Sequence, residues 1–352
     1  MMEKLKILML GPARDVKGGM TAVVDNYYNY GLDKEVELKY IETKNDKNII
    51  SKLLKMFIGY FEYIIKLKKY DIIHIHMSSR KSTIRKGIYL KTAKRYNKKA
   101  ILHIHGGAYK QFYEDECNER QKEKVRKILN LADKIIVLSE EWKDFFKGLV
   151  KEEKIEVIYN SIVIPGDFEK DLNTQKILFL GRIGPKKGIY DLLDVIEELI
   201  KKYPKLMLYV GGDGETDNIK RIIDEKNIGN NVKFLNWVKG EEKEKLLREC
   251  SFYVLPSYNE GMPISLIEAM AYKNVTISTE VGGIPSLIKN MENGILVKPG
   301  DKEAIYKNLE LLLKDAKLRK KLSENARIRA EEDFNINSNM KRILDLYKNI
   351  SK

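Results

Sequence analysis

The sequence predicts an α/β protein with two Rossmann-like domains, each a parallel sheet covered by helices on both faces. Short apolar runs alternate with longer helical patterns along the chain, as expected for buried parallel strands joined by helices. At 352 residues the chain exceeds the size at which one hydrophobic core usually stops growing. The alternation stops and restarts around residues 164–173, where Pro165, Gly166 and several charged residues interrupt it.

The first domain is predicted to cover residues 1–165. Its apolar runs predict six strands, over residues 6–10, 37–41, 72–76, 100–105, 134–138 and 155–159. Helical patterns lie between them, for example over residues 20–30 and 119–131.

The second domain is predicted to cover residues 166–335. Its strands are expected over residues 176–180, 205–210, 232–235, 252–256, 275–278 and 294–297. A separate helical pattern over residues 336–352 follows a break, and this helix could return to pack on the first domain.

The net charge of +14 is unevenly distributed. Residues 1–165 hold 33 Lys and Arg against 22 Asp and Glu, whereas the rest of the chain holds 32 against 29. This excess has two interpretations. It is a lysine-rich surface in contact only with solvent, or it serves to attract an anionic membrane, a phosphate-bearing acceptor or a nucleic acid. Nucleic-acid binding would need aromatic residues between the basic ones, and only Tyr70, Tyr89 and Tyr96 offer them, so we expect no nucleic-acid partner.

The composition indicates a reducing compartment. The two cysteines, Cys117 and Cys250, are far apart in the sequence and suggest no disulfide framework. The N-terminal apolar run ends at Gly11-Pro12 and is too short for a signal peptide, and no uncharged apolar stretch reaches 18 residues. We therefore expect a cytoplasmic protein that can touch the inner face of a membrane peripherally.

The most informative motif lies between a strand ending at Pro256 and a helix predicted to begin at Pro263. Pro263 suits the first helical position, because its missing N–H would be unpaired there. The free backbone N–H groups around it, those of Gly261, Met262 and Ile264, suit sugar or phosphate oxygens. Glu260 and Glu268 are separated by seven residues. A carboxylate accepts hydrogen bonds, as a ribose diol requires. A solvent-facing helix charge is the simpler interpretation of Glu268, but the largely apolar residues around it weaken that alternative.

A second cluster follows the strand over residues 176–180. Gly181, Arg182 and Lys187 form a plausible diphosphate clamp, in which Arg182 grips two oxygens and Lys187 supplies a flexible charge. Gly212 lies in a glycine-rich turn after the next strand, a weak signal that a plain turn explains better when it is taken alone.

The first half contributes Gly18, Gly19 and His105 at the carboxyl ends of strands. The two glycines would let a ligand approach the backbone closely. Four histidines invite a metal site, but no carboxylate or cysteine pair accompanies them and no Asp-x-Asp motif occurs, so we expect no metal.

Taken in order, these motifs resemble the retaining glycosyltransferases of family 4, also called glycosyl transferases group 1, over nearly the whole chain. The most specific element is Glu260-x7-Glu268 within Pro-Ser-x-x-Glu-Gly-x-Pro. The resemblance implies the GT-B fold, two Rossmann-like domains facing across a cleft. The chain departs from the family at Ser161 and Asn236, where glycine is frequent.

The resemblance also implies roles for individual residues. Glu268 would bind the ribose, Arg182 and Lys187 the diphosphate, and Glu260 with the Gly261–Met262 backbone the transferred sugar. His105 would lie beside that sugar. No metal or other cofactor is implied, because cationic side chains and helix ends neutralise the leaving group.

The sequence therefore predicts a retaining, metal-independent glycosyltransferase. It would move a hexosyl or N-acetylhexosaminyl group from a nucleotide-diphosphate sugar, with UDP favoured, to a sugar or lipid-linked sugar in cell-surface polysaccharide synthesis. Two alternatives remain: a nucleotide-sugar epimerase of the same architecture, and a non-catalytic relative that binds nucleotide-sugars.

Residues 49–69 predict an amphipathic helix with lysines on one face. We favour a helix that buries its wide apolar stripe in the domain core. The alternative is that the stripe and nearby lysines dock at an anionic membrane surface.

Overall fold

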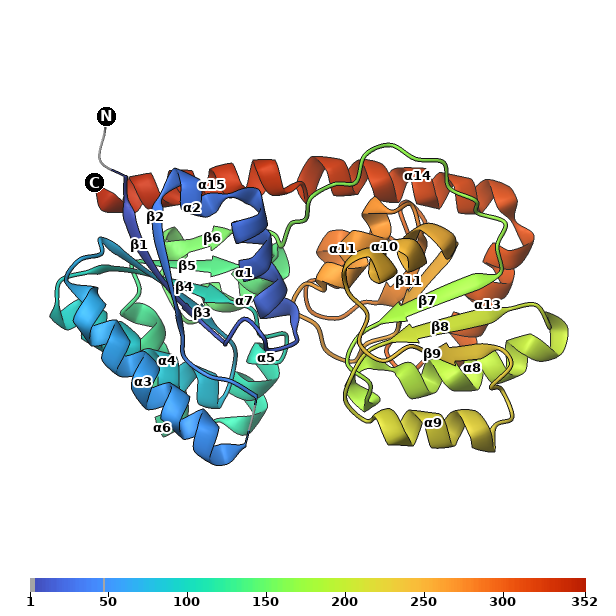
Figure 1. Cartoon of the computed structure of the whole chain (residues 1–352), viewed down its shortest axis with the longest axis horizontal. Helices are drawn as coiled ribbons and strands as arrows, with labels where there is room; N and C mark the ends of the chain where they lie inside the picture. The colour runs from blue at the N-terminus through green and yellow to red at the C-terminus, as the bar shows by residue number, and fades with distance from the viewer. Residues whose placement is uncertain (1–3, 47) are drawn as a thin grey trace. The chain divides into compact units, whose positions relative to one another are not determined.

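The computed structural model describes residues 4–46 and 48–352 (Figure 1). The chain divides into two compact units, the first formed by Met1–Val163 with Asn335–Lys352 and the second by Ile164–Phe334. The sequence predicts boundaries at 165/166 and 335/336. Each unit contains one six-stranded parallel sheet.

The sheet of the first unit has the order β2-β1-β3-β4-β5-β6. Its strands are β1 Lys6–Gly11, β2 Glu37–Glu42, β3 Ile72–Met77, β4 Lys99–Ile104, β5 Lys134–Val137 and β6 Ile155–Val157. Its helices are α1 Gly19–Tyr30, α2 Leu32–Glu35, α3 Ile49–Leu67, α4 Lys81–Arg95, α5 Tyr109–Gln111, η1 Phe112–Glu116, α6 Glu119–Asn130, α7 Glu140–Lys147, η2 Glu152–Lys154 and α15 Ile336–Ser351. Helices α3, α4 and α6 cover one face of the sheet, and α1 and α15 cover the other (Figure 1).

The sheet of the second unit has the order β12-β11-β10-β7-β8-β9. Its strands are β7 Lys176–Leu180, β8 Met207–Gly211, β9 Val232–Phe234, β10 Phe252–Leu255, β11 Val275–Thr279 and β12 Ile295–Val297. Its helices are η3 Pro185–Lys187, α8 Ile189–Lys202, α9 Thr216–Glu225, α10 Gly240–Glu249, α11 Ile264–Ala271, α12 Ile284–Leu287, α13 Lys302–Lys314 and α14 Ala316–Asp333.

The strands form because their apolar runs are buried on both sides. β3 and β10, for example, are buried at every position, as expected for parallel strands between two helical layers. All twelve predicted strands are present, with ends shifted by at most two residues. The predicted fold class is therefore confirmed.

Side-chain caps set the beginnings of several helices. Asn118 and Gln121 form a reciprocal capping box at α6, and the side chains of Ser139, Asp301 and Asp315 accept backbone N–H groups at α7, α13 and α14. Pro263 differs slightly from its predicted place, since it occupies the N-cap position and α11 begins at Ile264.

The favoured prediction for α3, that it buries its apolar stripe, is wrong. The side buried in the unit is narrow and consists of Gly59, Tyr63 and Leu67. A Cβ at Gly59 would approach the Glu42 carbonyl oxygen within 2.5 Å, and Tyr63 donates a hydrogen bond to the Tyr89 carbonyl at 2.8 Å. These contacts turn the wide apolar stripe outward, where its side chains are exposed.

Within the described ranges, none of the helices combines the length and apolar character needed to cross a bilayer.

Candidate functional site

The best-formed polar cluster lies where strand order reverses in the second sheet. β7 and β10 are hydrogen-bonded neighbours, with Ile177 opposite Phe252 and Leu178 opposite Tyr253. Helical connections leave these two strands in opposite directions across the sheet, so a crevice is expected at their carboxyl ends. The loops that follow them carry most of the predicted donor-binding residues.

Glu260 is the centre of this cluster. Its carboxylate is buried, with 7% of the side chain exposed, and Oε1 accepts hydrogen bonds from Lys187 Nζ at 2.5 Å and Ser257 Oγ at 2.7 Å. An unpaired buried carboxylate would be costly, and this pair of donors offsets that cost. The structure thus brings together Lys187 and Glu260, which lie 73 positions apart in the sequence.

Two glycines hold the backbone that presents Glu260. Gly188 has φ +67° and Gly282 has φ +56°, and in both the missing Cβ leaves room for a carbonyl oxygen, that of Pro256 and of Glu260 respectively. Tyr258 N also donates to the Lys186 carbonyl at 2.9 Å. Any larger residue at either glycine would be strained and would overlap the loop, so the close packing of the backbone that carries Glu260 requires glycine at both positions.

Glu268 lies in α11 and pairs with Lys243 of α10. Lys243 Nζ is 2.6 Å from Glu268 Oε1, and only 18% of the Glu268 side chain is exposed. Glu268 is therefore not the solvent-facing helix charge of the simpler interpretation. Its carboxylate is held by one cation and is accessible enough to accept hydroxyl groups.

The loop after β7 is joined to the loop after β8. Gly212 N donates to the Asn236 carbonyl after β9 at 2.7 Å. Gly181 N donates to the Gly211 carbonyl at 3.0 Å, Ile183 N donates to the Asp213 carbonyl at 2.6 Å, and Ile183 forms a bridge with Gly214. These bonds fix the backbone on either side of Arg182, whose side chain is exposed. Arg182 is thus available to a ligand on a rigid support.

The backbone conformation of Asn236 explains why asparagine can stand where the family often has glycine. Its φ is +57°, in the left-handed region that glycine adopts most readily and asparagine tolerates better than most residues.

The start of α11 supplies mainly backbone. Met262, Pro263 and Ile264 are buried, so they shape the wall of the cluster and offer a ligand few side-chain polar groups. Gly261 carbonyl accepts the Gly283 N–H at 2.8 Å, which ties this segment to the loop after β11.

Gly18, Gly19 and His105 lie in the first unit. Gly18 precedes α1, and a Cβ at Gly18 or Gly19 would meet no atom within 4 Å, so the backbone here is open to a ligand.

His105 belongs to a stack that contains all four histidines of the chain. The β3–β4 register places His76 opposite His103, and the ring centroids of successive members are 4.1–5.4 Å apart. His76 Nδ1 is 2.8 Å from His105 Nε2, and His74 Nε2 is 3.2 Å from His103 Nδ1. His74 Nδ1 also bonds the hydroxyl of Tyr347 in α15 at 2.6 Å.

Burial keeps these imidazoles neutral. It lowers the pKa of His74 and of His105 to about 3 and holds the pKa of His76 and His103 well below the ordinary value, with neighbouring histidines adding to the effect. Nitrogens of His74, His76 and His103 lie within 4.8 Å of one another. Because His74 and His103 bond each other directly, the geometry favours a hydrogen-bonded stack over a set of metal ligands.

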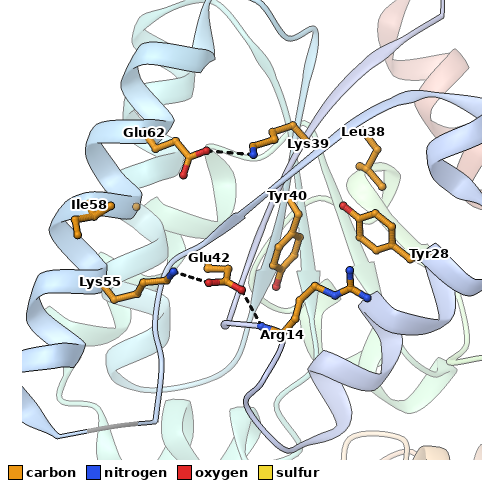
Figure 2. A pocket seen from close by; sticks show the side chains of 10 residues that line it. Arg14, Tyr28, Leu38, Lys39, Tyr40, Glu42, Lys55, Ile58 and Glu62 are labelled. Carbon is orange, nitrogen blue, oxygen red and sulfur yellow. Dashed lines mark hydrogen bonds and ion pairs between the residues drawn. The ribbon is translucent and has the colours of Figure 1, made fainter.

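A hollow of about 360 Å³ lies between α3 and the edge strand β2 (Figure 2). Its charged side chains are paired: Lys55 with Glu42 at 2.5 Å, Lys39 with Glu62 at 3.4 Å, and Arg14 with Asp25 at 2.7 Å. Partial burial acts to raise the pKa of Glu42, but hydrogen bonds from Lys55 and the Arg14 amide lower it overall. The hollow is lined by Arg14, Tyr28, Leu38, Lys39, Tyr40, Glu42, Lys55, Ile58, Gly59 and Glu62.

Two family models match the chain in succession. The model described as Glycosyltransferase Family 4 matches residues 36–164, and the model described as Glycosyl transferases group 1 matches residues 162–329. The chain belongs to the group 1 glycosyltransferases. The second match covers the whole Glu260–Lys187 cluster, so the resemblance inferred from the motifs is confirmed.

The curated relatives of this group 1 glycosyltransferase are distant. An uncharacterized glycosyltransferase of Haemophilus influenzae is 30% identical over 57% of the chain, and the chain spans 57% of its length. An uncharacterized glycosyltransferase of Methanocaldococcus jannaschii is 27% identical over 56% of the chain, and the chain spans 54% of its length. A UDP-Gal:alpha-D-GlcNAc-diphosphoundecaprenol alpha-1,3-galactosyltransferase of Escherichia coli is 26% identical over 90% of the chain and 84% of that protein.

Solved structures share the fold of this glycosyltransferase. Sucrose-phosphate synthase from Thermosynechococcus elongatus superposes with a TM-score of 0.83 at 20% identity, covering 99% of each chain. HepE of Anabaena in complex with UDP-glucose gives 0.76 at 18% identity, covering 98% of this chain and 100% of that one. At these identities the likeness establishes the fold, which is GT-B, as predicted.

Several residues that contact the predicted site residues are not predicted from the sequence. Ser257 stands three positions before Glu260, a spacing at which a loop serine reaches a following side chain, and this signal was available. No sequence pattern predicts the contacts of Lys243 with Glu268 and of Tyr347 with His74, because tertiary folding alone brings each pair together.

Proposed function

We propose that the chain is a retaining glycosyltransferase that works without a metal ion. It moves a hexosyl or N-acetylhexosaminyl group from a UDP-sugar to a sugar or lipid-linked sugar acceptor, in the synthesis of a cell-surface polysaccharide at the inner face of the membrane. The observation that carries this proposal is the buried Glu260 held by Lys187 and Ser257 at the point where strand order reverses.

The donor's diphosphate is proposed to bind at Lys187 and Arg182. Lys187 is about one-quarter exposed and ion-paired to Glu260, so an arriving diphosphate can draw its ammonium away while Ser257 continues to donate to the carboxylate. Arg182 would add a bidentate contact from its exposed position. Together the two cations would stabilise the charge that develops on the leaving diphosphate.

The remaining groups are proposed to hold the rest of the donor. Glu268 would accept hydrogen bonds from the ribose hydroxyls, with Lys243 holding the carboxylate in place. Glu260 would accept hydroxyls of the transferred sugar. The bond between the anomeric carbon and the diphosphate then breaks, the acceptor oxygen bonds to the same face, and the acceptor's proton passes to the departing diphosphate.

Two relatives support the choice of substrates. HepE was solved with UDP-glucose, and the Escherichia coli enzyme uses a UDP-sugar and a diphosphoundecaprenol acceptor, as their names state. The role that the resemblance implies for His105 remains a prediction.

Thermal-shift measurements with UDP, GDP, ADP and their sugars test the proposal. A ligand at 100 times its Kd stabilises the folded protein by about 2.7 kcal/mol, so the true donor raises Tm by several degrees. Glu268→Ala and Arg182→Ala should remove this shift, whereas Glu303→Ala, which breaks an exposed helical pair with Lys307, should keep it. No shift with any nucleotide would contradict the proposal, and conversion of a UDP-sugar without acceptor would indicate an epimerase.

A further inference from the structure

The outer face of α3 is the most unusual surface of the first unit. Six large apolar side chains at helical spacing are each about half to four-fifths exposed, with Ile50 at 79%, Phe57 at 73% and Phe61 at 70%. Single exposed apolar residues are ordinary, but a contiguous stripe marks an interaction site. We call this stripe the docking face: Ile50, Leu53, Leu54, Phe57, Phe61 and Ile65.

The orientation of α3 is fixed by contacts on its other sides. Figure 2 shows Lys55 and Glu62 turned toward Glu42 and Lys39, with which they form ion pairs along β2. Tyr60 and Tyr63 pack against Tyr89 of α4 with ring centroids 5.3 and 5.1 Å apart. The helix therefore cannot roll to bury the docking face without breaking both sets of contacts.

Helix α4 extends this surface. Ile84 and Ile88 are exposed on its outer side, and Lys81, Lys91 and Arg95 are exposed at the same helical spacing. Exposed Lys68 and Lys69 follow the end of α3. Apolar side chains surrounded by cations are the arrangement of helices that lie at the interface of a bilayer with anionic lipids.

The charge of the whole chain supports an anionic occupant. The first unit holds 37 Lys and Arg against 23 Asp and Glu, while the second holds 28 of each, so the entire excess of +14 belongs to the unit with the docking face. A second copy of the chain would bring two basic units together and is disfavoured by like charge. An anionic lipid surface complements both the charge and the apolar stripe.

We infer that the docking face binds anionic phospholipid bilayers. Phe57 and Phe61 enter the acyl boundary, and α3 lies in the plane of the interface. Lys68 and Lys69 after α3, with the exposed lysines and arginine of α4, contact lipid phosphates. The purpose of this binding, access to a lipid-linked acceptor, rests on the proposed function, but the binding itself does not depend on transferase activity.

Vesicle co-sedimentation of the full chain tests the inference. Vesicles of phosphatidylcholine with one-quarter phosphatidylglycerol should bind the wild type at low salt, and pure phosphatidylcholine vesicles and high salt should weaken binding severalfold. The double variant Phe57→Ser/Phe61→Ser should bind at least tenfold more weakly. Its Tm should be unchanged, because both side chains are already exposed.

The matched control is Leu311→Ser/Ile328→Ser, which removes two exposed apolar side chains from the second unit and should leave vesicle binding unchanged. Absence of wild-type binding to anionic vesicles would overturn the inference, as would unchanged binding by the Phe57/Phe61 variant. A dimer in solution that this variant dissociates, without vesicle binding, would assign the docking face to a second copy instead. UDP-sugar thermal shifts measured on the same samples report separately on the proposed function.

Discussion

The two units share an architecture and differ in almost everything that meets solvent or ligand. Both are six-stranded parallel sheets between helices. The second unit has no net charge, and its ion-paired acids and bases gather where its strand order reverses. The first unit carries the whole net charge, all four histidines and the exposed apolar stripe of α3. The comparison shows that a repeated fold leaves the chemistry to loops and outer faces.

The largest predicted difference between the units is their response to acid. His74, His76 and His103 are neutral in the folded first unit with lowered pKa values, while the unfolded chain binds protons below about pH 6.5. The unfolded state therefore binds more protons as pH falls, and stability is lost from about pH 6.5 downward. Between pH 7.5 and 5.5 we expect the free energy of unfolding to fall by about 1.4 kcal/mol for each of these three histidines, or about 4 kcal/mol, and His105, whose pKa is also lowered, adds to this fall.

Each unit contains one tryptophan, which allows the two to be followed separately. Urea unfolding of Trp237→Phe reports the first unit through Trp142, and Trp142→Phe reports the second through Trp237. The midpoint from Trp142 should move to lower urea at pH 5.5 much more than that from Trp237. Equal shifts would mean that the histidine stack does not set the acid response.

Gly282→Ala, compared with Gly240→Ala, tests how much stability the packing against the Glu260 loop adds to the second unit. The substitution forces a side chain into the left-handed region and against the Glu260 carbonyl, so we expect a loss of about 3 kcal/mol in stability and of donor binding. Gly240 has the same φ of +56° with no atom within 4 Å of a Cβ, so Gly240→Ala should cost only about 1 kcal/mol. Equal costs, measured by urea unfolding, would show that contact with the Glu260 loop is unimportant.

Lys187→Ala tests the proposed diphosphate contact. Losing a charge-assisted hydrogen bond should weaken donor binding by about 2 kcal/mol, which calorimetric titration with the donor would show as a roughly thirtyfold rise in Kd. Lys186→Ala is the matched control, because that neighbouring side chain is exposed and only its backbone carbonyl holds the loop. A similar loss in both variants would point to general electrostatics.

Lys243→Ala should have the smallest effect. The ion pair with Glu268 is partly exposed, so its removal should lower stability by about 0.5 kcal/mol, seen as a small drop in Tm. Lys307→Ala, which breaks the exposed pair with Glu303, gives the baseline. A drop well above that baseline would show that the Lys243–Glu268 pair is more than an ordinary surface contact.

The strands and the loops that carry Lys187 and Glu260 were predictable because local patterns determine them, whereas the contact between these two side chains depends on β7 and β10 being neighbours. Buried parallel strands are continuous apolar runs, and residues after neighbouring strands meet at one edge of a sheet. The orientation of α3 was not predictable, since amphipathicity shows that a helix has two faces but not which one the domain covers. The histidine stack depends on the register of β3 against β4 and on Tyr347, 273 positions from His74.

The placement of α15 also bears on how the protein is made. Tyr347, Met340 and Ile343 are buried in the first unit, yet the whole second unit is translated before them. At ordinary ribosomal speeds of about 5–20 residues per second, the first sheet waits roughly ten to thirty seconds for the helix that covers its histidine face. During that interval the second unit can complete its own core, so biosynthesis should finish the later unit first and leave the earlier one as a nascent intermediate that a chaperone can recognise.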